Sequence, residues 1–263
     1  MGYNKFIAYG KRFELYQYEK GLPIRGSKGK SQADYGSSDF RDGGESLVVS
    51  GVAGGVQATK GKRSDNAQRA SMAFRRLVAC NLQGDENPLL LTFTYRENKV
   101  DVADAYRDFS SCVQALRYKF GKNFKYICVP EFQKRGAVHF HALFWGVQAS
   151  LLGVQREWPS NSIDCYFWSY GFTFCKETDG HLKIASYLSK YMRKTFADPR
   201  LAARKAYVTS RNIERPVIGG GFSDFGLSLI LDDYVGVDNS SIQNLKFDTK
   251  WLGSCDYQLF IIK

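Results

Sequence analysis

Residues 125–145 contain two runs rich in β-branched and aromatic residues, KYICVPEFQ and AVHFHALFW, separated by a short basic segment. Runs of this kind predict strands, and the short connection between them predicts an antiparallel hairpin. The hairpin therefore requires a sheet in the fold. Pro130 cannot donate a hydrogen bond to a neighbouring strand, which indicates a sheet edge or a bulge at that position.

The length of the hairpin loop decides which residues share a face. On a strand, His139 and His141 point to the same side. A two- or four-residue loop would set Glu131 opposite Phe140, on the other face, whereas the three-residue loop Lys134–Gly136 would pair Glu131 with His139. Three-residue hairpins end on a residue with positive φ, which Gly136 adopts without strain. The turn therefore favours Glu131 on the histidine face.

Two imidazoles and one carboxylate on a common face can hold a divalent cation and leave positions for a substrate oxygen. The sequence thus predicts a metal site formed by Glu131, His139 and His141. The ion would be Mg²⁺ or Mn²⁺, because imidazole ligands favour Mn²⁺ whereas Mg²⁺ is more abundant. The alternative is a half-buried strand whose histidines make ordinary hydrogen bonds.

The segments around the hairpin add strands and helices. PLLLTFTY predicts a central strand with Thr92 and Thr94 on one face, and GFTFCKET predicts another strand. Three helices are predicted: SDNAQRASMAFRRLVACNL with a cap at Ser64 or Asp65, DVADAYRDFSSCVQALRYKFGK ending at Gly121, and DGHLKIASYLSKYMRKTF. This order predicts the α+β class, with an antiparallel sheet and helices on one side.

Composition divides the chain into three regions. Residues 1–63 are expected to be a glycine-rich segment that is partly loop. Positions 21–62 contain ten of the 25 glycines and one strand-like run, ESLVVSGV. Residues 64–216 form the main domain, and 217–263 an extension whose run YQLFIIK could complete the sheet. GLPIRGSK has Ser before Lys where a phosphate-binding loop needs the reverse, so no ATPase is expected.

A pair of tyrosines lies on the last predicted helix, in ASYLSKYMRK. Tyr187 and Tyr191 are four residues apart and therefore project from one helical face. Lys190 and Lys194 each follow a tyrosine by three residues. The alternative is a core stripe at helical spacing, with the lysines reaching out to solvent.

Basic residues are concentrated around this helix. The chain carries a net charge of +11, and between positions 183 and 215 nine basic residues face two acidic ones, a net of 9 − 2 = +7. A nucleic acid backbone would be attracted there. A cation that polarises a phosphate, an attacking phenolate, and lysines that offset developing charge are the parts of a phosphodiester transesterification. Catalytic roles are thus predicted for Tyr187, Tyr191, Lys190 and Lys194, with nearby cations favouring the phenolate.

Three motifs together resemble the HUH superfamily of rolling-circle replication initiators, found in small phages and plasmids with circular single-stranded DNA. LLLTFTY is similar to the first motif, HFH at 139–141 is similar to the histidine motif, and YLSKYMRK is similar to a doubled tyrosine motif of microvirus type. Glu131 takes the place of the upstream acidic ligand. The resemblance covers residues 88–194 and implies an RRM-like antiparallel sheet beside the tyrosine helix.

The resemblance also implies an activity. A tyrosine would nick one strand at an origin, keep the 5′ phosphate as a phosphotyrosine and leave a 3′ hydroxyl as a primer, and the second tyrosine would serve when the displaced strand is rejoined. Single-stranded origin DNA, a host helicase and a host polymerase would be the partners, with no nucleotide cofactor. Two alternatives remain: an HUH transposase or mobilisation relaxase, and a non-catalytic module that binds single-stranded nucleic acid by charge and stacking.

The six cysteines show no paired spacing typical of zinc or of a disulfide framework. With no signal peptide and no membrane-spanning run, this indicates the reducing cytoplasm of a bacterial host. The third histidine, His181, is expected near the start of the tyrosine helix and without a catalytic role.

Overall fold

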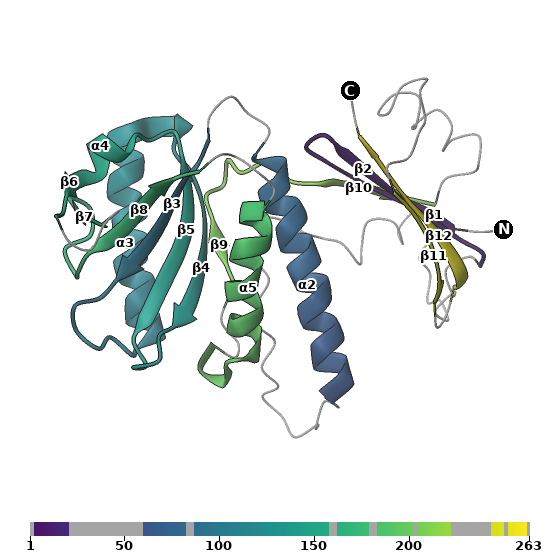
Figure 1. The fold of residues 1–263 in the computed structure, drawn as a ribbon, viewed down its shortest axis with the longest axis horizontal. Coiled ribbons are helices and arrows are strands. Elements are labelled where there is room, and N and C mark those ends of the chain that lie inside the picture. Colours follow the sequence, from purple (N-terminus) through teal and green to yellow (C-terminus); the bar gives the residue numbers. More distant parts are fainter. Residues whose placement is uncertain are drawn as a thin grey trace, which may run out of the picture. The chain divides into compact units, whose positions relative to one another are not determined.

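The computed structural model describes residues 3–20, 60–82, 87–157, 162–178, 183–201, 205–221, 243–249 and 252–261 (Figure 1). The chain forms two compact units. The larger comprises Gly44–Glu214, and the smaller combines Met1–Gly43 with Arg215–Lys263. His181 and the run ESLVVSGV lie outside the described residues.

The larger unit contains a seven-stranded sheet in which every neighbouring pair is antiparallel. Its strand order is β6 (Gly153–Gln155), β7 (Ser162–Cys165), β8 (Thr173–Glu177), β3 (Leu89–Thr94), β5 (Val138–Trp145), β4 (Lys125–Phe132) and β9 (Val208–Thr209). The predicted α+β class is confirmed, and β3 is a central strand between β8 and β5 as expected.

Helices cover both faces of this sheet, so the expectation of helices on one side is wrong (Figure 1). Helix α3 (Val102–Phe120) packs on one face, where Phe109 stacks on Phe140 with ring centroids 4.8 Å apart. Helices α2 (Lys60–Cys80) and α5 (Lys183–Ala197) pack on the other, around Leu143 and Trp145. The reason is that β5 buries apolar side chains in both directions, and each face needs a cover.

The ends of the helices test two further expectations. Helix α3 begins after Asp101, whose side chain accepts a hydrogen bond from the Asp104 N–H at 2.7 Å, and ends at Gly121 with φ 72°, as predicted. Helix α2 begins at Lys60, so the predicted cap at Ser64 or Asp65 is wrong. Lysine and arginine are good helix formers, and the helix continues through the basic residues that precede Ser64.

The smaller unit contains a five-stranded sheet in the order β10 (Val217–Gly220), β1 (Tyr3–Tyr9), β2 (Arg12–Tyr18), β12 (Gly253–Ile261) and β11 (Gln243–Thr249). The C-terminal run that was expected to extend the sheet of the hairpin is a strand, and it pairs with β2. All six cysteines of the chain are buried free thiols. None of the helices among the described residues is both long and apolar enough to cross a membrane.

Candidate metal and tyrosine site

The hairpin has the predicted three-residue loop. The N–H of Gln133 donates to the carbonyl of Ala137 at 2.8 Å, which leaves Lys134–Gly136 as the connection. Gly136 has φ 94° and donates to the Gln133 carbonyl at 2.9 Å. Glu131 pairs with His139 in the register of β4 and β5, so the predicted register is confirmed. Because alternate residues share a face, Glu131, His139 and His141 face the same side.

Replacing Gly136 by alanine should lower the free energy of unfolding by about 1–2 kcal/mol, because a Cβ is disfavoured at positive φ. The nearest atom to that Cβ would be a methyl carbon of Val100 at 3.7 Å, so the cost is one of backbone conformation rather than of crowding. Urea denaturation measures it. Gly136→Asn should cost less, since asparagine tolerates this conformation; an alanine variant as stable as the parent would contradict the argument.

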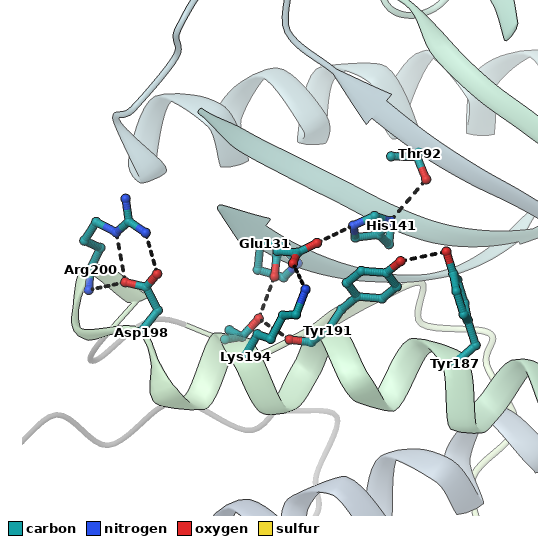
Figure 2. A network of polar contacts seen from close by, with 10 residues as sticks. Thr92, Glu131, His141, Tyr187, Tyr191, Lys194, Asp198 and Arg200 are labelled. Atoms are coloured by element: carbon teal, nitrogen blue, oxygen red, sulfur yellow. Dashed lines mark hydrogen bonds and ion pairs between the residues drawn. The ribbon is translucent and has the colours of Figure 1, made fainter. Parts of the chain in front are cut away.

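His141 is held between two polar groups (Figure 2). Its Nε2 lies 2.8 Å from Glu131 Oε2, and its Nδ1 lies 3.1 Å from Thr92 Oγ1 on β3. Burial opposes ionisation of Glu131, but hydrogen bonds from His141 and Lys194 outweigh it and lower the pKa of the carboxyl group. An ionised carboxylate only accepts hydrogen bonds, so Nε2 of His141 donates to Glu131 in this arrangement.

His139 lies beside His141, with ring centroids 6.0 Å apart. Burial, and then the neighbouring His141, lower the pKa of His139 to about 4, which leaves its ring neutral. Its Nε2 is buried without a hydrogen-bond partner in the part of the chain that is described. In the tautomer with the proton on Nδ1, this nitrogen has a lone pair available to a cation.

Helix α5 brings both tyrosines to the histidines (Figure 2). The ring of Tyr191 stacks on that of His141 with centroids 3.7 Å apart, and its hydroxyl donates to the Tyr187 hydroxyl at 2.6 Å. Tyr187 is 38% exposed. Lys194 bonds Glu131 Oε1 at 2.5 Å and lies 5.3 Å from the centre of the Tyr191 ring. Carboxylate, imidazole, ammonium and phenol groups therefore meet at one place.

The predicted effect of a bound cation on the phenol stays a prediction, whereas the protein surroundings of Tyr191 act in the opposite direction. Burial, followed by the hydrogen bond to Tyr187, raises the pKa of Tyr191. The phenol is therefore protonated at neutral pH in this arrangement, and its proton must be removed during an attack on a phosphate.

One of the predicted site residues is not brought into this cluster. Lys190 is exposed on α5, and among the described residues it makes no hydrogen bond or ion pair to the other predicted site residues. The two lysines follow the tyrosines at the same spacing, but only Lys194 lies over Glu131.

Thr195 holds the tyrosine helix against the sheet, a contact that sequence reasoning missed. Strand β9 pairs only with Ile127 and Cys128 of β4, so at Pro130 the outer side of β4 is an edge, in agreement with the expectation for this proline. The fully buried Thr195 hydroxyl lies 2.5 Å from the Pro130 carbonyl and 3.1 Å from that of Tyr191. The sequence offered one indication of this contact: Thr195 follows Tyr191 by four residues and therefore lies on the same helical face.

Thr195→Val should lower the free energy of unfolding by about 1–3 kcal/mol, because the Pro130 carbonyl would stay buried without its donor. Thr195→Ser keeps the hydroxyl and should lose less than half as much. Chemical denaturation of the three proteins compares them. Equal losses for valine and serine would mean that packing of the methyl group, and not the hydrogen bond, holds the helix.

No preassembled cluster of three metal-ligating side chains is found in the described ranges. Glu131 instead bonds His141 directly. The donor types nevertheless suit a divalent cation, and the unpartnered Nε2 of His139 agrees with one. Binding through Nε2 of His141 would require its proton to leave and its contact with Glu131 to open.

Residues 88–196 match the family model described as replication-associated protein ORF2/G2P. This segment is thus similar to replication-associated proteins. It runs from the start of β3 almost to the end of α5 and so includes Thr92, Glu131, both site histidines and the tyrosine pair. No curated protein and no solved structure matches the chain significantly.

Proposed function

We propose that the larger unit is a site-specific endonuclease and strand transferase of the HUH type that starts rolling-circle replication. The observation that carries this proposal is the position of the Tyr191 ring on His141, with the Tyr187 hydroxyl 2.6 Å from that of Tyr191. This pairing lies within the segment that matches the replication-associated family.

In this proposal, Glu131, His139 and His141 hold Mg²⁺ or Mn²⁺. The bound cation would polarise the scissile phosphate and offset the charge that develops on it. The side chains of this chain orient the site: Thr92 fixes the ring of His141, and Lys194 lies beside the carboxylate. Lys194 is also placed to attract a DNA phosphate.

The proposed reaction is a transesterification. An Oη–P bond forms to tyrosine as the P–O3′ bond of the DNA breaks, and the phenol loses a proton while O3′ gains one. Tyr191 already donates its hydrogen bond to Tyr187, which is partly exposed, so the proton has a short route to solvent. The products are a 5′-phosphotyrosine and a 3′ hydroxyl primer. One phosphate ester replaces another, so the step needs no nucleotide cofactor.

The second tyrosine permits a return reaction. The two tyrosine hydroxyls lie 2.6 Å apart. When one of them is esterified to the DNA, the other could therefore attack the regenerated origin. The released 3′ hydroxyl would then attack the first phosphotyrosine and circularise the displaced strand. A polymerase and a helicase of the host would supply synthesis and unwinding in this scheme.

Enzymes that serve DNA transposition or plasmid transfer use the same chemistry, so a transposase or a mobilisation relaxase is the alternative. The match to a replication-associated family favours the initiator. Binding of single-stranded DNA alone does not require two phenol hydroxyls beside a pair of imidazoles, so this arrangement favours the enzyme over a binding module.

A denaturing gel tests the proposal. Protein and Mn²⁺ are incubated with single-stranded DNA of random sequence, labelled at one end or the other. Label at the 3′ end should move with the protein, because the tyrosine keeps the 5′ phosphate of that fragment, whereas label at the 5′ end should appear in shorter free DNA that a polymerase can extend. A chelator should remove both signals. DNA binding without any adduct would refute the enzyme and support the binding module.

A further inference from the structure

Strand β11 forms one edge of the five-stranded sheet in the smaller unit (Figure 1). Among the described residues it pairs with β12 alone, and every one of its residues before Thr249 is exposed. Leu245 is 50% exposed and Phe247 is 43% exposed. An edge strand directs backbone N–H and C=O groups away from its sheet and can therefore pair with a further strand. Two exposed apolar side chains on the same strand favour a protein as that neighbour.

A row of side chains crosses the sheet and ends at this edge. The buried Cys255 of β12 lies directly opposite Phe247, Tyr18 of β2 lies opposite Cys255, and Tyr3 of β1 lies opposite Tyr18. The rings of Tyr3 and Tyr18 stack with their centroids 5.9 Å apart. The row thus contains aromatic rings and a thiol from β1 to β11, and its last member is an exposed phenylalanine. A second aromatic ring beside Phe247 would continue it.

The charges on the opposite face of β11 indicate which strand fits. Lys246 and Asp248 flank Phe247 in the sequence and share that face. Lys246 forms an ion pair of 3.5 Å with Asp256 on β12. A lysine on an edge strand usually opposes pairing with another strand. Here, however, an antiparallel strand of the same sequence brings a carboxylate to each lysine, because Asp248 follows Lys246 by two residues.

Symmetry restricts the register of such a pair. Two antiparallel copies of an edge strand are related by a twofold axis perpendicular to the sheet, so directly opposite residues lie on the same face. Residues on the same face are an even number of positions apart, and the axis must therefore pass through a pair of identical residues. With Phe247 at the axis, Lys246 of each copy lies opposite Asp248 of the other. An axis at Lys246 or Asp248 would instead place like charges opposite each other, which is unfavourable.

We propose that two copies of this chain associate through β11, with the twofold axis at Phe247, and that their five-stranded sheets join into one continuous sheet. The two Phe247 rings then lie side by side on one face, and two Lys246–Asp248 pairs lie on the other. This interaction surface belongs to the smaller unit, so the inference goes beyond the proposed nicking activity and does not depend on it.

Disulfide cross-linking of the full chain tests the register. Phe247→Cys places two thiols directly opposite each other, where the Cα atoms are about 4.5–5.5 Å apart, within the range of about 4.4–6.8 Å that a disulfide spans. Leu245→Cys is the matched control, because it is exposed to a similar extent but its two Cα atoms would be ~13 Å apart, four residues along the strands. The six native cysteines are buried and should contribute little.

After oxidation, a non-reducing gel should show a covalent dimer of the Phe247→Cys protein and far less of one for Leu245→Cys. Any other result would overturn the proposed register, including a dimer from both variants in equal amounts or from neither.

Equilibrium sedimentation over a series of concentrations tests the association itself. The parent protein should change from monomer to dimer as its concentration rises. Asp248→Lys places a lysine opposite Lys246 at two positions of the pair and should raise the dissociation constant at least about tenfold. Asp248→Asn removes the attraction without adding repulsion and should raise it less. Because Asp248 is exposed, both variants should fold like the parent.

A parent protein that stays monomeric would refute the dimer, and equal dissociation constants for the three proteins would show that β11 is not the contact. Species larger than a dimer would mean that β11 pairs with a different edge, such as β10 of the next copy, and would refute the twofold arrangement. Neither measurement depends on DNA cleavage, so a failure here is distinct from a failure of the proposed function.

Discussion

Protein in which both Tyr187 and Tyr191 are replaced by phenylalanine should form no covalent adduct with single-stranded DNA. Each substitution removes only a hydroxyl, so the ring of residue 191 can still stack on His141. Loss of both nucleophiles should lower the cleavage rate by at least about 10³-fold, as when the nucleophile of other covalent enzymes is removed. The adduct on a denaturing gel measures this. Tyr118→Phe, at a tyrosine that is 96% exposed on α3, is the matched control and should cleave at the parental rate.

The single variants separate the two hydroxyls. Because they lie 2.6 Å apart, either could reach the same phosphate, and each single variant should keep part of the cleavage activity while losing most strand circularisation. If one single variant loses cleavage as completely as the double variant, only one tyrosine is a nucleophile, and the proposed exchange between them is wrong.

Loss of either histidine should remove most of the stabilisation of the protein by Mn²⁺. For the parent, Mn²⁺ at 100 times its Kd should stabilise the folded state by about 2.7 kcal/mol, which raises the Tm. His139→Ala and His141→Ala should each weaken Mn²⁺ binding by at least about 100-fold, because each removes a nitrogen ligand from a set of three. Calorimetric titration with Mn²⁺ and thermal unfolding with and without it measure the effect independently of catalysis.

The control for this experiment is His181→Ala, which removes the one remaining histidine of the chain. It should bind Mn²⁺ like the parent. If the three histidine variants bind Mn²⁺ equally well, the cation does not sit on the hairpin, and the unpartnered Nε2 of His139 needs another explanation.

The hairpin shows what local sequence can determine. Gly136 at the end of a short basic segment was sufficient to predict the loop length, and the loop length placed Glu131 opposite His139. Strand alternation then put both histidines on one face, and helical spacing put Tyr187 and Tyr191 together. These relations depend on residues close in sequence, whose geometry follows from two backbone periodicities.

Only the tertiary structure decided which face of the sheet the tyrosine helix covers and which lysine reaches Glu131. Glu131 and Lys194 are 63 positions apart, and their contact results from the packing of Leu188 and Met192 of α5 on the side of the sheet opposite α3. No local pattern distinguishes Lys190 from Lys194, since each follows a tyrosine by three residues. The cavity lined by Glu131, Lys134 and Lys194 is likewise formed by β4, the hairpin loop and α5 together, and only the packed chain brings these segments together.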